Sequence, residues 1–350
     1  MIKYIKLFFI SLLLIQNAIA ESHIMYAHFI DVGQGDATLL QFPCGIVLID
    51  AGAQDDGHVT KLTSYLNKFF TKNKKYNNTI NTIIITHTHI DHTRALREVV
   101  NKFTVNNYID NGQLEGPGTL NPKWLRKVAK QKKISVNVII DKNITVLENK
   151  MGFSNSAIDP ISCDSIDPEI RILSSKLDEN PGWPHSSFDN KNNHSIVTRV
   201  DFGKSSFLFT GDLQEDAIDT LLEYYNQTDI LDIDIYQVGH HGSHNATTKE
   251  LLEKMSPAIA VISMGKWDYG RDTSKQFSTW SYGHPRINIL NKLKNQIKRR
   301  RSYTVEVAGA VGAKNFKPYK VSKAVYGTGW FGTVIIRADN KGKFRVTHYK

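Results

Sequence analysis

The sequence predicts an α/β fold in which two β-sheets pack against each other and helices cover their outer faces. Short runs of β-branched and aromatic residues alternate with amphipathic segments of helical spacing from His23 onward. This alternation occurs twice, once in each half of the chain, so each half is expected to supply one sheet and its helices. With 350 residues, 41% of them hydrophobic, the chain can bury the core that such a sandwich needs.

The first half contains the first set of expected elements. Apolar, β-branched runs predict strands at residues 24–30, 38–42, 46–49, 81–86, 136–140 and 144–147. Apolar residues at helical spacing predict helices at residues 59–70 and 94–103. Asn121 followed by Pro122 is an N-cap with proline in the first turn, which opens another helix that runs to Lys130.

The second half repeats the pattern. Strands are expected at residues 195–202, 206–210, 230–238, 258–263, 303–307, 333–337 and 344–347. Helices are expected at residues 213–225, from Thr247, where Glu250 completes a capping box, and at 285–298. Between the halves, residues 152–193 are rich in Ser, Asn, Asp and Pro and are predicted to form a loop insert.

The first twenty residues have the organisation of a secretory signal peptide. Lys3 and Lys6 precede a nine-residue apolar run, and Ala18-Ile19-Ala20 supplies small residues for cleavage after Ala20. The run is too short to cross a bilayer, and no later segment is long and apolar enough to do so, so no stable membrane insertion is expected. Residues 21–350 are then expected to form the secreted or periplasmic domain, and removal of two lysines lowers the net charge from +10 to +8.

The chain has two cysteines, Cys44 and Cys163, which excludes a disulfide-stapled scaffold and a cysteine-rich zinc module. An oxidising compartment would allow the two to pair. Neither lies in a spacing pattern typical of disulfides, so the sequence leaves their pairing open.

The strongest chemical signal is the run Thr86-His87-Thr88-His89-Ile90-Asp91-His92, which follows an apolar strand and precedes a helix. His87 and His89 can face one point, while Asp91 and His92 come from the following turn and face a second. Imidazole and carboxylate are the ligands that Zn²⁺ and similar ions prefer. The run therefore predicts a metal site at the end of this strand.

Three further strand ends carry the same residue types. Asp212 follows an apolar strand in Phe-Thr-Gly-Asp, and a carboxylate there can bridge two cations. His240 and His241 lie between glycines at the end of another strand, and either is a candidate ligand. Asp50 ends a third strand, where it is expected to hold a ligating histidine from behind.

These residues, in this order, resemble the metallo-β-lactamase superfamily. The segments at 29–36, 209–212, 239–243 and 283–285 are more closely similar to the extracellular hydrolase domain of ComEC-type DNA-uptake (competence) proteins, and phosphorylcholine esterases are a further similar branch. The resemblance covers about residues 26–286. It implies an αββα sandwich, which agrees with the two halves described above.

The resemblance also implies a ligand set for two divalent metal ions, Zn²⁺ or, as an alternative, Mn²⁺. His87 and His89 would bind one ion, Asp91 and His92 the other, and Asp212 would bridge them. The remaining candidates are His240 or its competitor His241 for the second ion, and His194, or less favourably His185, for the first; His194 alternatively lines the pocket. Asp31, Asp36 and Asp50 are expected to support the ligands from behind.

The chemistry expected of such a site is hydrolysis by a metal-activated water. Asp91 is the candidate to orient that water or accept its proton, and His284 is the candidate to donate to the leaving group. The favoured function is an exported, metal-dependent phosphodiesterase acting on DNA or a phosphorylated surface polymer. The alternatives are an acyl hydrolase of the β-lactamase or lactonase type and a non-catalytic protein that binds DNA or a polymer.

Two further features bear on the substrate. A basic run from Lys292 to Arg301 is expected to give the late helix a positive tip, which suits a polyanion such as nucleic acid, although a solvated helix face is the alternative. An aromatic cluster precedes His284 and would form either a stacking platform or a loop core. Its members are Trp267, Tyr269, Phe277, Trp280 and Tyr282.

Overall fold

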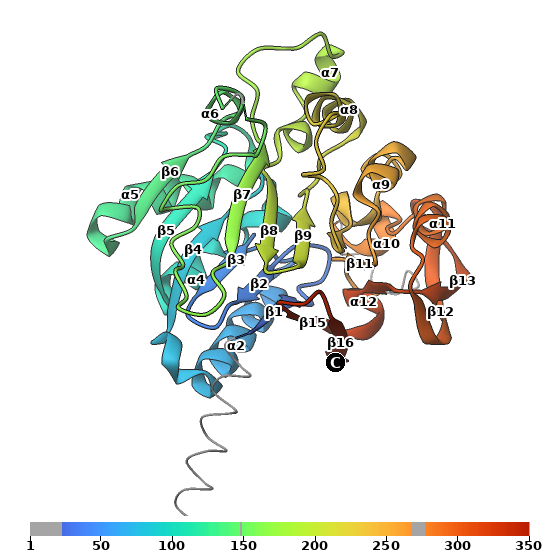
Figure 1. Cartoon of the computed structure of the whole chain (residues 1–350), viewed down its shortest axis with the longest axis horizontal. Helices are drawn as coiled ribbons and strands as arrows, with labels where there is room; N and C mark the ends of the chain where they lie inside the picture. The colour runs from blue at the N-terminus through green and yellow to red at the C-terminus, as the bar shows by residue number, and fades with distance from the viewer. Residues whose placement is uncertain (1–22, 148, 268–276, 350) are drawn as a thin grey trace, which may run out of the picture.

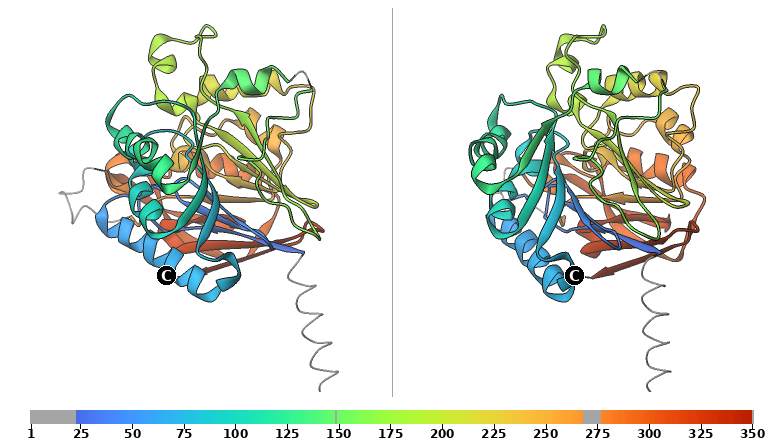
Figure 2. Two further views of the ribbon diagram at one scale, coloured as in Figure 1. Left: turned by 90° about the vertical axis from the view of Figure 1, so that its left-hand side faces the viewer. Right: turned by 60° about the vertical axis from the view of Figure 1, so that its left-hand side comes forward.

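The computed structural model describes residues 23–147, 149–267 and 277–349 of the chain (Figure 1). The predicted signal peptide and Tyr269 lie outside these residues. The described part is a four-layer αββα sandwich, as the sequence predicted, in which two β-sheets face each other and helices cover both outer faces (Figure 2).

The first sheet has eight strands within the described residues, in the order β16-β15-β1-β2-β3-β4-β5-β6. Their bounds are β1 (Ile24–Phe29), β2 (Thr38–Gln41), β3 (Ile46–Ile49), β4 (Thr79–Ile84), β5 (Thr104–Asp110), β6 (Ser135–Val138), β15 (Thr333–Asp339) and β16 (Phe344–Tyr349). On its outer face lie α2 (Asp56–Lys72), α4 (Leu96–Lys102) and α5 (Leu120–Lys132).

The second sheet has six described strands in the order β14-β11-β10-β9-β8-β7. Their bounds are β7 (Glu169–Ser174), β8 (Val197–Phe202), β9 (Ser205–Phe209), β10 (Ile235–Gln237), β11 (Ile259–Ile262) and β14 (Val325–Gly327). On its outer face lie α8 (Glu215–Tyr224), α9 (Lys249–Met255) and α11 (Ile287–Gln296). A separate antiparallel ribbon is formed by β12 (Arg300–Gly312) and β13 (Asn315–Lys323).

Short helices complete the described elements. They are α3 (Ile90–Thr93), α6 (Asp141–Thr145), α7 (His185–Phe188), α10 (Thr279–Tyr282) and α12 (Thr328–Phe331), with the 3₁₀ turns η1 (Lys74–Tyr76), η2 (Pro117–Thr119), η3 (Lys191–His194) and η4 (Gly239–Gly242).

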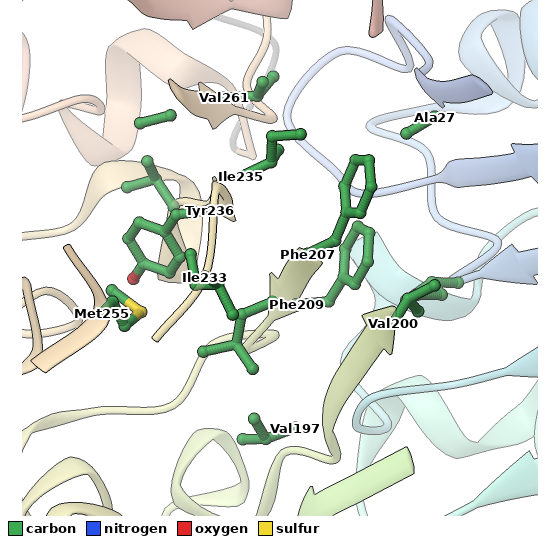
Figure 3. Close-up of a cluster of buried hydrophobic side chains, with 14 of the residues drawn as sticks. Ala27, Val197, Val200, Phe207, Phe209, Ile233, Ile235, Tyr236, Met255 and Val261 are labelled. Carbon is green, nitrogen blue, oxygen red and sulfur yellow. The ribbon is translucent and has the colours of Figure 1, made fainter. Parts of the chain in front are cut away.

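The core between the sheets is apolar and continuous. Phe29 of β1 stacks on Phe209 of β9 with ring centroids 6.2 Å apart, so the two sheets meet directly through aromatic side chains. Figure 3 shows the second sheet's part of this core, where Phe207 and Phe209 lie beside Val200 of β8. Full burial of each such side chain contributes about 1.5–3 kcal/mol to the free energy of unfolding.

The direction of the strands positions the chemistry. In the first sheet, β3, β4, β5 and β6 run parallel to one another. In the second sheet, β9, β10, β11 and β14 are also parallel. The carboxyl ends of parallel strands lie along one edge of a sheet, where open α/β sheets bind ligands. The strand ends that carry the candidate ligands are therefore brought to facing edges.

Three expectations about elements are wrong. Residues 144–147 do not form a strand; Asn143 Oδ1 accepts a hydrogen bond from the Ile140 backbone N–H and so favours the helix α6. The predicted loop at 152–193 contains β7, whose apolar residues Ile170 and Ile172 alternate with polar ones and point into the core. The last two strands, β15 and β16, do not extend the second sheet but return to pair beside β1 in the first.

The late helix ends earlier than expected. α11 stops at Gln296, and the backbone of Ile297 is extended. Arg299, Arg300 and Arg301 therefore do not form a helix tip: Arg300 and Arg301 begin the strand β12. The β-branched run that follows them favours a strand, and it pairs with β13 over most of its length.

The pairing of the two cysteines, which the sequence left open, is resolved. Cys44, in the turn between β2 and β3, forms a disulfide bond with Cys163, and the two Cα atoms lie 5.6 Å apart. The bond ties the segment before β7 to the first sheet.

Among the described residues, none of the helices is both long and hydrophobic enough to cross a membrane.

Candidate metal centre

Four strand ends from both sheets meet in one place. His87, His89, Asp91 and His92 follow β4, and Asp50 follows the neighbouring β3. Asp212 follows β9 of the other sheet, and His240 and His241 follow β10. The Asp212 carboxylate is buried at the centre of this group. Its oxygens lie 3.3–3.9 Å from Nε2 of four histidines, which are His87, His92, His240 and His241.

Asp50 fixes the orientation of His92. Its carboxylate accepts hydrogen bonds from the backbone N–H and the hydroxyl of Thr86, both at 2.8 Å, and from Nδ1 of His92 at 2.7 Å. Because Nδ1 donates to Asp50, Nε2 of His92 faces the opposite side, 3.3 Å from Asp212 Oδ1, and offers a lone pair to a cation once its proton has left. The supporting role predicted for Asp50 has the geometry it requires.

His241 is oriented in the same way by the backbone. Its Nδ1 donates to the carbonyl oxygen of Ser263 at 2.7 Å. Its Nε2 therefore faces the site, 3.3 Å from Asp91 Oδ2 and 3.9 Å from Asp212 Oδ2. A backbone carbonyl or a carboxylate on the far nitrogen is the usual support of a metal-binding histidine.

The donor atoms form a group that fits a cation. Ligand atoms of Asp91, His92, Asp212 and His241 all lie within 4.8 Å of one another. Nε2 of His92 and Nε2 of His241 are buried and have no hydrogen-bond partner among the described residues. Leaving two buried nitrogens unsatisfied is costly, and a divalent cation at their common point would satisfy both.

A second group shares Asp212 with the first. It consists of His87, His89 and Asp212, with Nε2 of His87 3.1 Å from Nδ1 of His89 and 3.7 Å from Asp212 Oδ2. The far nitrogen of His87 lies 3.2 Å from the hydroxyl of Thr86 and 3.4 Å from that of Ser195. Two neighbouring groups that share one carboxylate fit a pair of bridged cations.

The charges in the cluster alter the protonation of its histidines. Burial alone would lower the pKa of His92, but Asp212 and Asp50 outweigh it and raise the pKa well above its usual value. His241 behaves alike: Asp212 and Asp91 overcome burial and raise its pKa to about 9. Burial and the neighbouring His92 instead lower the pKa of His87 well below its usual value. A cation that binds at the first group must displace protons from it.

The backbone around the site is strained. Asp50, His240 and His241 have φ angles of 57°, 48° and 53°, in the left-handed region that residues with a Cβ seldom occupy. Each such residue costs on the order of 1–3 kcal/mol, and this kind of strain is concentrated at functional sites. Gly52 shows a second constraint, since a Cβ there would lie 1.6 Å from the carbonyl oxygen of Asp91.

A cavity of about 360 Å³ opens onto the cluster. His89, Asp91, Asp212, His240 and His241 line its base. Its wall includes His284, whose ring stacks on Tyr282 with centroids 5.7 Å apart.

His284 is held by a residue that the sequence did not single out. The side-chain amide of Gln34 donates to Nδ1 of His284 at 3.2 Å, and its carbonyl oxygen accepts from the Thr279 hydroxyl at 2.8 Å. The proton of His284 is therefore on Nε2. Burial, followed by the nearby His240 and His241, lowers the pKa of His284 well below its usual value, so the ring is a neutral donor.

His194 does not join either group, which corrects the expectation that it ligates the first metal or lines the pocket. Its Nδ1 accepts from the Leu177 backbone N–H at 3.3 Å, and its Nε2 donates to the Phe188 carbonyl at 2.7 Å. Both nitrogens are used, and the ring packs against Trp183 and Phe188. His185, the less favoured candidate, begins α7 and is exposed.

The two neighbouring histidines of η4 differ. His241 belongs to the first ligand group, whereas His240 does not join either group, although its Nε2 lies 3.7 Å from Asp212 Oδ2. The Nδ1 of His240 accepts from the Gln214 amide at 3.3 Å. The structure therefore favours His241 over His240 for the second cation and leaves His240 facing the cavity.

The other two predicted supporting carboxylates lie in different places. Asp36 is buried behind the cluster with Asp50 and His92, and it accepts from the amide of Gln237. Burial and the charge of Asp50 raise its pKa to about 7. Asp31 is not part of the cluster; it pairs with Lys61 and accepts from the Gly33 backbone, so it stabilises the loop instead.

Two supporting residues, Gln34 and Gln237, were not predicted from the sequence. Gln34 donates a hydrogen bond to His284, and Gln237 donates one to Asp36. Gln34 lies inside the loop Asp31-Val32-Gly33-Gln34-Gly35-Asp36 that carried the resemblance. The sequence shows only that a glutamine lies between two glycines in this loop, and its partner His284 is 250 positions away.

Comparisons with known proteins agree with this geometry. A family profile described as the metallo-beta-lactamase superfamily matches residues 30–266. Recombination protein 2 of Haemophilus influenzae is 42% identical over 77 residues, which are 22% of this chain and 9% of that protein. ComE operon protein 3 of Bacillus subtilis is 30% identical over 103 residues, 29% of this chain and 11% of that protein.

The matched segments thus span about a tenth of the length of these curated relatives. Among solved structures, the metallo-beta-lactamase fold protein YhfI from Bacillus subtilis is 10% identical, with a TM-score of 0.44 over 85% of this chain and 99% of that one.

Proposed function

The chain belongs to the metallo-β-lactamase superfamily, whose members are generally metal-dependent hydrolases, and we propose that it hydrolyses phosphodiesters with two divalent cations. The observation that carries the proposal is the pair of ligand groups that share Asp212, with two buried imidazole nitrogens that lack partners. Binding alone would not require this donor set, which argues against a non-catalytic role.

His87, His89 and Asp212 would hold one cation, and Asp91, His92, Asp212 and His241 the other. Nitrogen and carboxylate donors of this kind favour Zn²⁺, with Mn²⁺ as the alternative. When bound, the cations would supply a water of lowered pKa and Lewis-acid contacts to the substrate's oxygens.

The chain's own residues would orient the reacting groups. The Asp91 side chain is a quarter exposed and lies at the base of the cavity, so its carboxylate can accept a hydrogen bond from the attacking water. The Nε2–H of His284 is directed by Gln34 and can donate to a phosphoryl or leaving oxygen. Because burial keeps His284 neutral, it acts as a hydrogen-bond donor rather than as a charged acid.

A paired assay tests the reaction class. The chain without its first twenty residues, here called the mature chain, is expected to hydrolyse bis-p-nitrophenyl phosphate and to leave a chromogenic cephalosporin intact. Cleavage of the cephalosporin alone would assign the site to acyl chemistry, and cleavage of neither by metal-loaded protein would favour a binding protein.

We also propose that the protein is exported and loses residues 1–20. The charged start, short apolar run and Ala-Ile-Ala site support this, and the Cys44–Cys163 disulfide is compatible with an extracellular protein. N-terminal sequencing of the secreted or periplasmic protein is expected to begin at Glu21. Recovery of intact Met1 in the cytosolic fraction would contradict export.

A further inference from the structure

The cavity contains one positively charged side chain that the proposed metal centre does not use. Among the described residues that line it, Arg94 is the only lysine or arginine. It directly follows the helix α3, which carries the candidate ligands Asp91 and His92. Arg94 is half-buried, and no described carboxylate forms an ion pair with it. A partly desolvated charge without a counter-ion is unfavourable, so an anionic group beside it would be stabilising.

The guanidinium of Arg94 is held on one side and free on the other. Its Nε donates a hydrogen bond to the Ala53 carbonyl oxygen at 3.0 Å. Its two terminal nitrogens have no partner among the described residues, and neither is sealed from solvent. The backbone beneath is fixed, because the Ala51 N–H donates to the His92 carbonyl at 3.0 Å and the Ala95 N–H donates to the Ala51 carbonyl at 2.8 Å. The free nitrogens are therefore held in place before a ligand binds, which limits the entropy lost on binding.

Gln54 adds a second hydrogen-bond donor beside Arg94. Its Oε1 accepts from the backbone N–H of Gln34 at 2.9 Å, which directs its amide nitrogen to the other side. That nitrogen has no partner among the described residues, and Gln54 also lines the cavity. Because Arg94 donates to the carbonyl of the preceding residue, Ala53, the two side chains are neighbours. A group of donors that includes the planar fork of an arginine matches the oxygens of a carboxylate or a phosphate.

This pair of donors lies close to the reacting centre without forming part of it. Asp91 and Arg94 are three positions apart on one helical turn, and residues with this spacing have Cβ atoms about 5–6 Å apart. The guanidinium nevertheless forms no ion pair with the carboxylate of Asp91 or of Asp212. An arginine that shared the scissile phosphate with the cations would approach these carboxylates. Arg94 therefore faces a second group of the substrate, on an arm beside the scissile bond.

We propose that Arg94 and Gln54 form a subsite for a second anionic group of the substrate, a carboxylate or a phosphate. The preferred substrate is then a diester with one arm that carries a negative charge of its own. The inference rests on the proposed function for the group that the cations hold, but occupancy of the subsite can be measured without turnover.

The test uses phosphonates, because a phosphonate binds divalent cations as a phosphate does while its carbon–phosphorus bond resists hydrolysis. Dissociation constants are measured by isothermal titration calorimetry on the metal-loaded mature chain. One series of ligands ends in a methyl group, a second in a carboxylate and a third in another phosphonate, each with alkyl spacers of increasing length. At one spacer length, a charged end is expected to raise the affinity at least about tenfold over the methyl end. The charged series with the larger increase identifies the anion.

Four variants assign this increase in affinity to residues. Arg94→Gln should abolish it, and Arg94→Lys, which keeps the charge but lacks the planar fork, should retain only part of it. Gln54→Glu keeps an acceptor for the Gln34 N–H but places a negative charge in the subsite, so the methyl-ended ligand should become the tighter one. Arg97→Gln is the matched control and should keep the full increase. Arg97, on α4, is exposed, lies 5.1 Å from the centre of the Trp124 ring and does not line the cavity.

Two results would overturn the subsite. One is that no spacer length lets a charged end improve binding to the unaltered protein. The other is that Arg94→Gln weakens all three series equally, because the arginine would then hold the metal-bound phosphonate itself. If Arg94→Gln does not fold, as judged by circular dichroism and thermal unfolding, Arg94→Lys and Gln54→Glu carry the test, and an unaltered preference in both would also overturn the subsite.

Hydrolysis of bis-p-nitrophenyl phosphate by the unaltered protein separates this inference from the proposed function, since this diester has no second anionic group. If the diester is not cleaved but the preference for a charged end is present and depends on Arg94, the proposed function fails and the subsite stands. If the diester is cleaved and no such preference exists, the proposed function stands and the subsite fails.

Discussion

The amide of Gln34 and the imidazole of His284 are hydrogen-bonded at 3.2 Å, although 250 positions separate them in the chain. Gln34 comes from the loop after the first strand of one sheet, and His284 comes from the segment that precedes α11 on the other. The contact joins the two walls of the cavity and selects the tautomer in which His284 donates from Nε2. It makes Gln34 a positioning residue for the reaction.

Replacement of Gln34 tests this role. Gln34→Leu removes the donor to Nδ1 and is expected to lower kcat for a phosphodiester about tenfold, with a smaller effect on KM. His284→Ala should lower kcat at least as much, and the double variant should show no further loss, because both changes remove one interaction. Multiplicative losses in the double variant would show that the two residues act independently.

The shared carboxylate should determine metal content. Asp212→Asn is expected to remove at least one equivalent of metal and to lower activity roughly 100-fold or more, since the variant lacks the charge that both groups share. Asp219→Asn, an exposed change on α8, is the matched control and should alter neither quantity. Full metal content and full activity in Asp212→Asn would refute the bridging role.

The disulfide should contribute substantially to stability. It closes a loop across a sequence separation of 119, so its loss is expected to lower the free energy of unfolding by about 2–5 kcal/mol. Denaturant unfolding with and without reductant measures this difference. Cys163→Ala should unfold like the reduced protein and should not respond to reductant; a response there would point to another cause.

His28 should make stability depend on pH. Burial lowers its pKa to about 4, although the hydrogen bond to Gln41 opposes the shift. The unfolded chain therefore binds the proton more tightly between pH 6.5 and 4, and this contribution to stability is complete above pH 6.5 and is lost as the pH falls through 4.

At pH 5 the loss amounts to about 2 kcal/mol relative to neutral pH. His28→Phe keeps the aromatic packing against Phe69 and should lose less stability than the unaltered protein between pH 7 and 5. Parallel unfolding curves for the two proteins over this range would contradict the assignment.

The sequence predicted those site residues that lie close together in the chain or directly after an apolar strand. His87, His89, Asp91 and His92 lie within six positions at the end of an apolar strand, so their convergence follows from strand geometry alone. Asp212 and Asp50 were found because each ends an apolar strand. The sandwich followed from the two similar halves of the chain.

The remaining features depend on contacts that no local pattern records. His194 precedes β8 at a plausible position for a ligand, but the Leu177 N–H and the Phe188 carbonyl engage both of its nitrogens. β15 has the pattern of any half-buried strand, and only tertiary packing places it beside β1. From the sequence alone, Arg300 and Arg301 resemble the continuation of the helix α11. Only the pairing of β12 with β13 shows that they belong to a strand.

The most direct test of the two-cation account is a metal titration of the mature protein followed by diester hydrolysis. Protein stripped with a chelator and dialysed is expected to be inactive on bis-p-nitrophenyl phosphate. Added Zn²⁺ or Mn²⁺ should restore the rate of hydrolysis. The rate should reach its plateau when two equivalents of metal are bound, as measured by elemental analysis, because the ligands form two groups around Asp212. Hydrolysis that persists at full rate without metal, or protein that binds no divalent metal at all, would contradict the account.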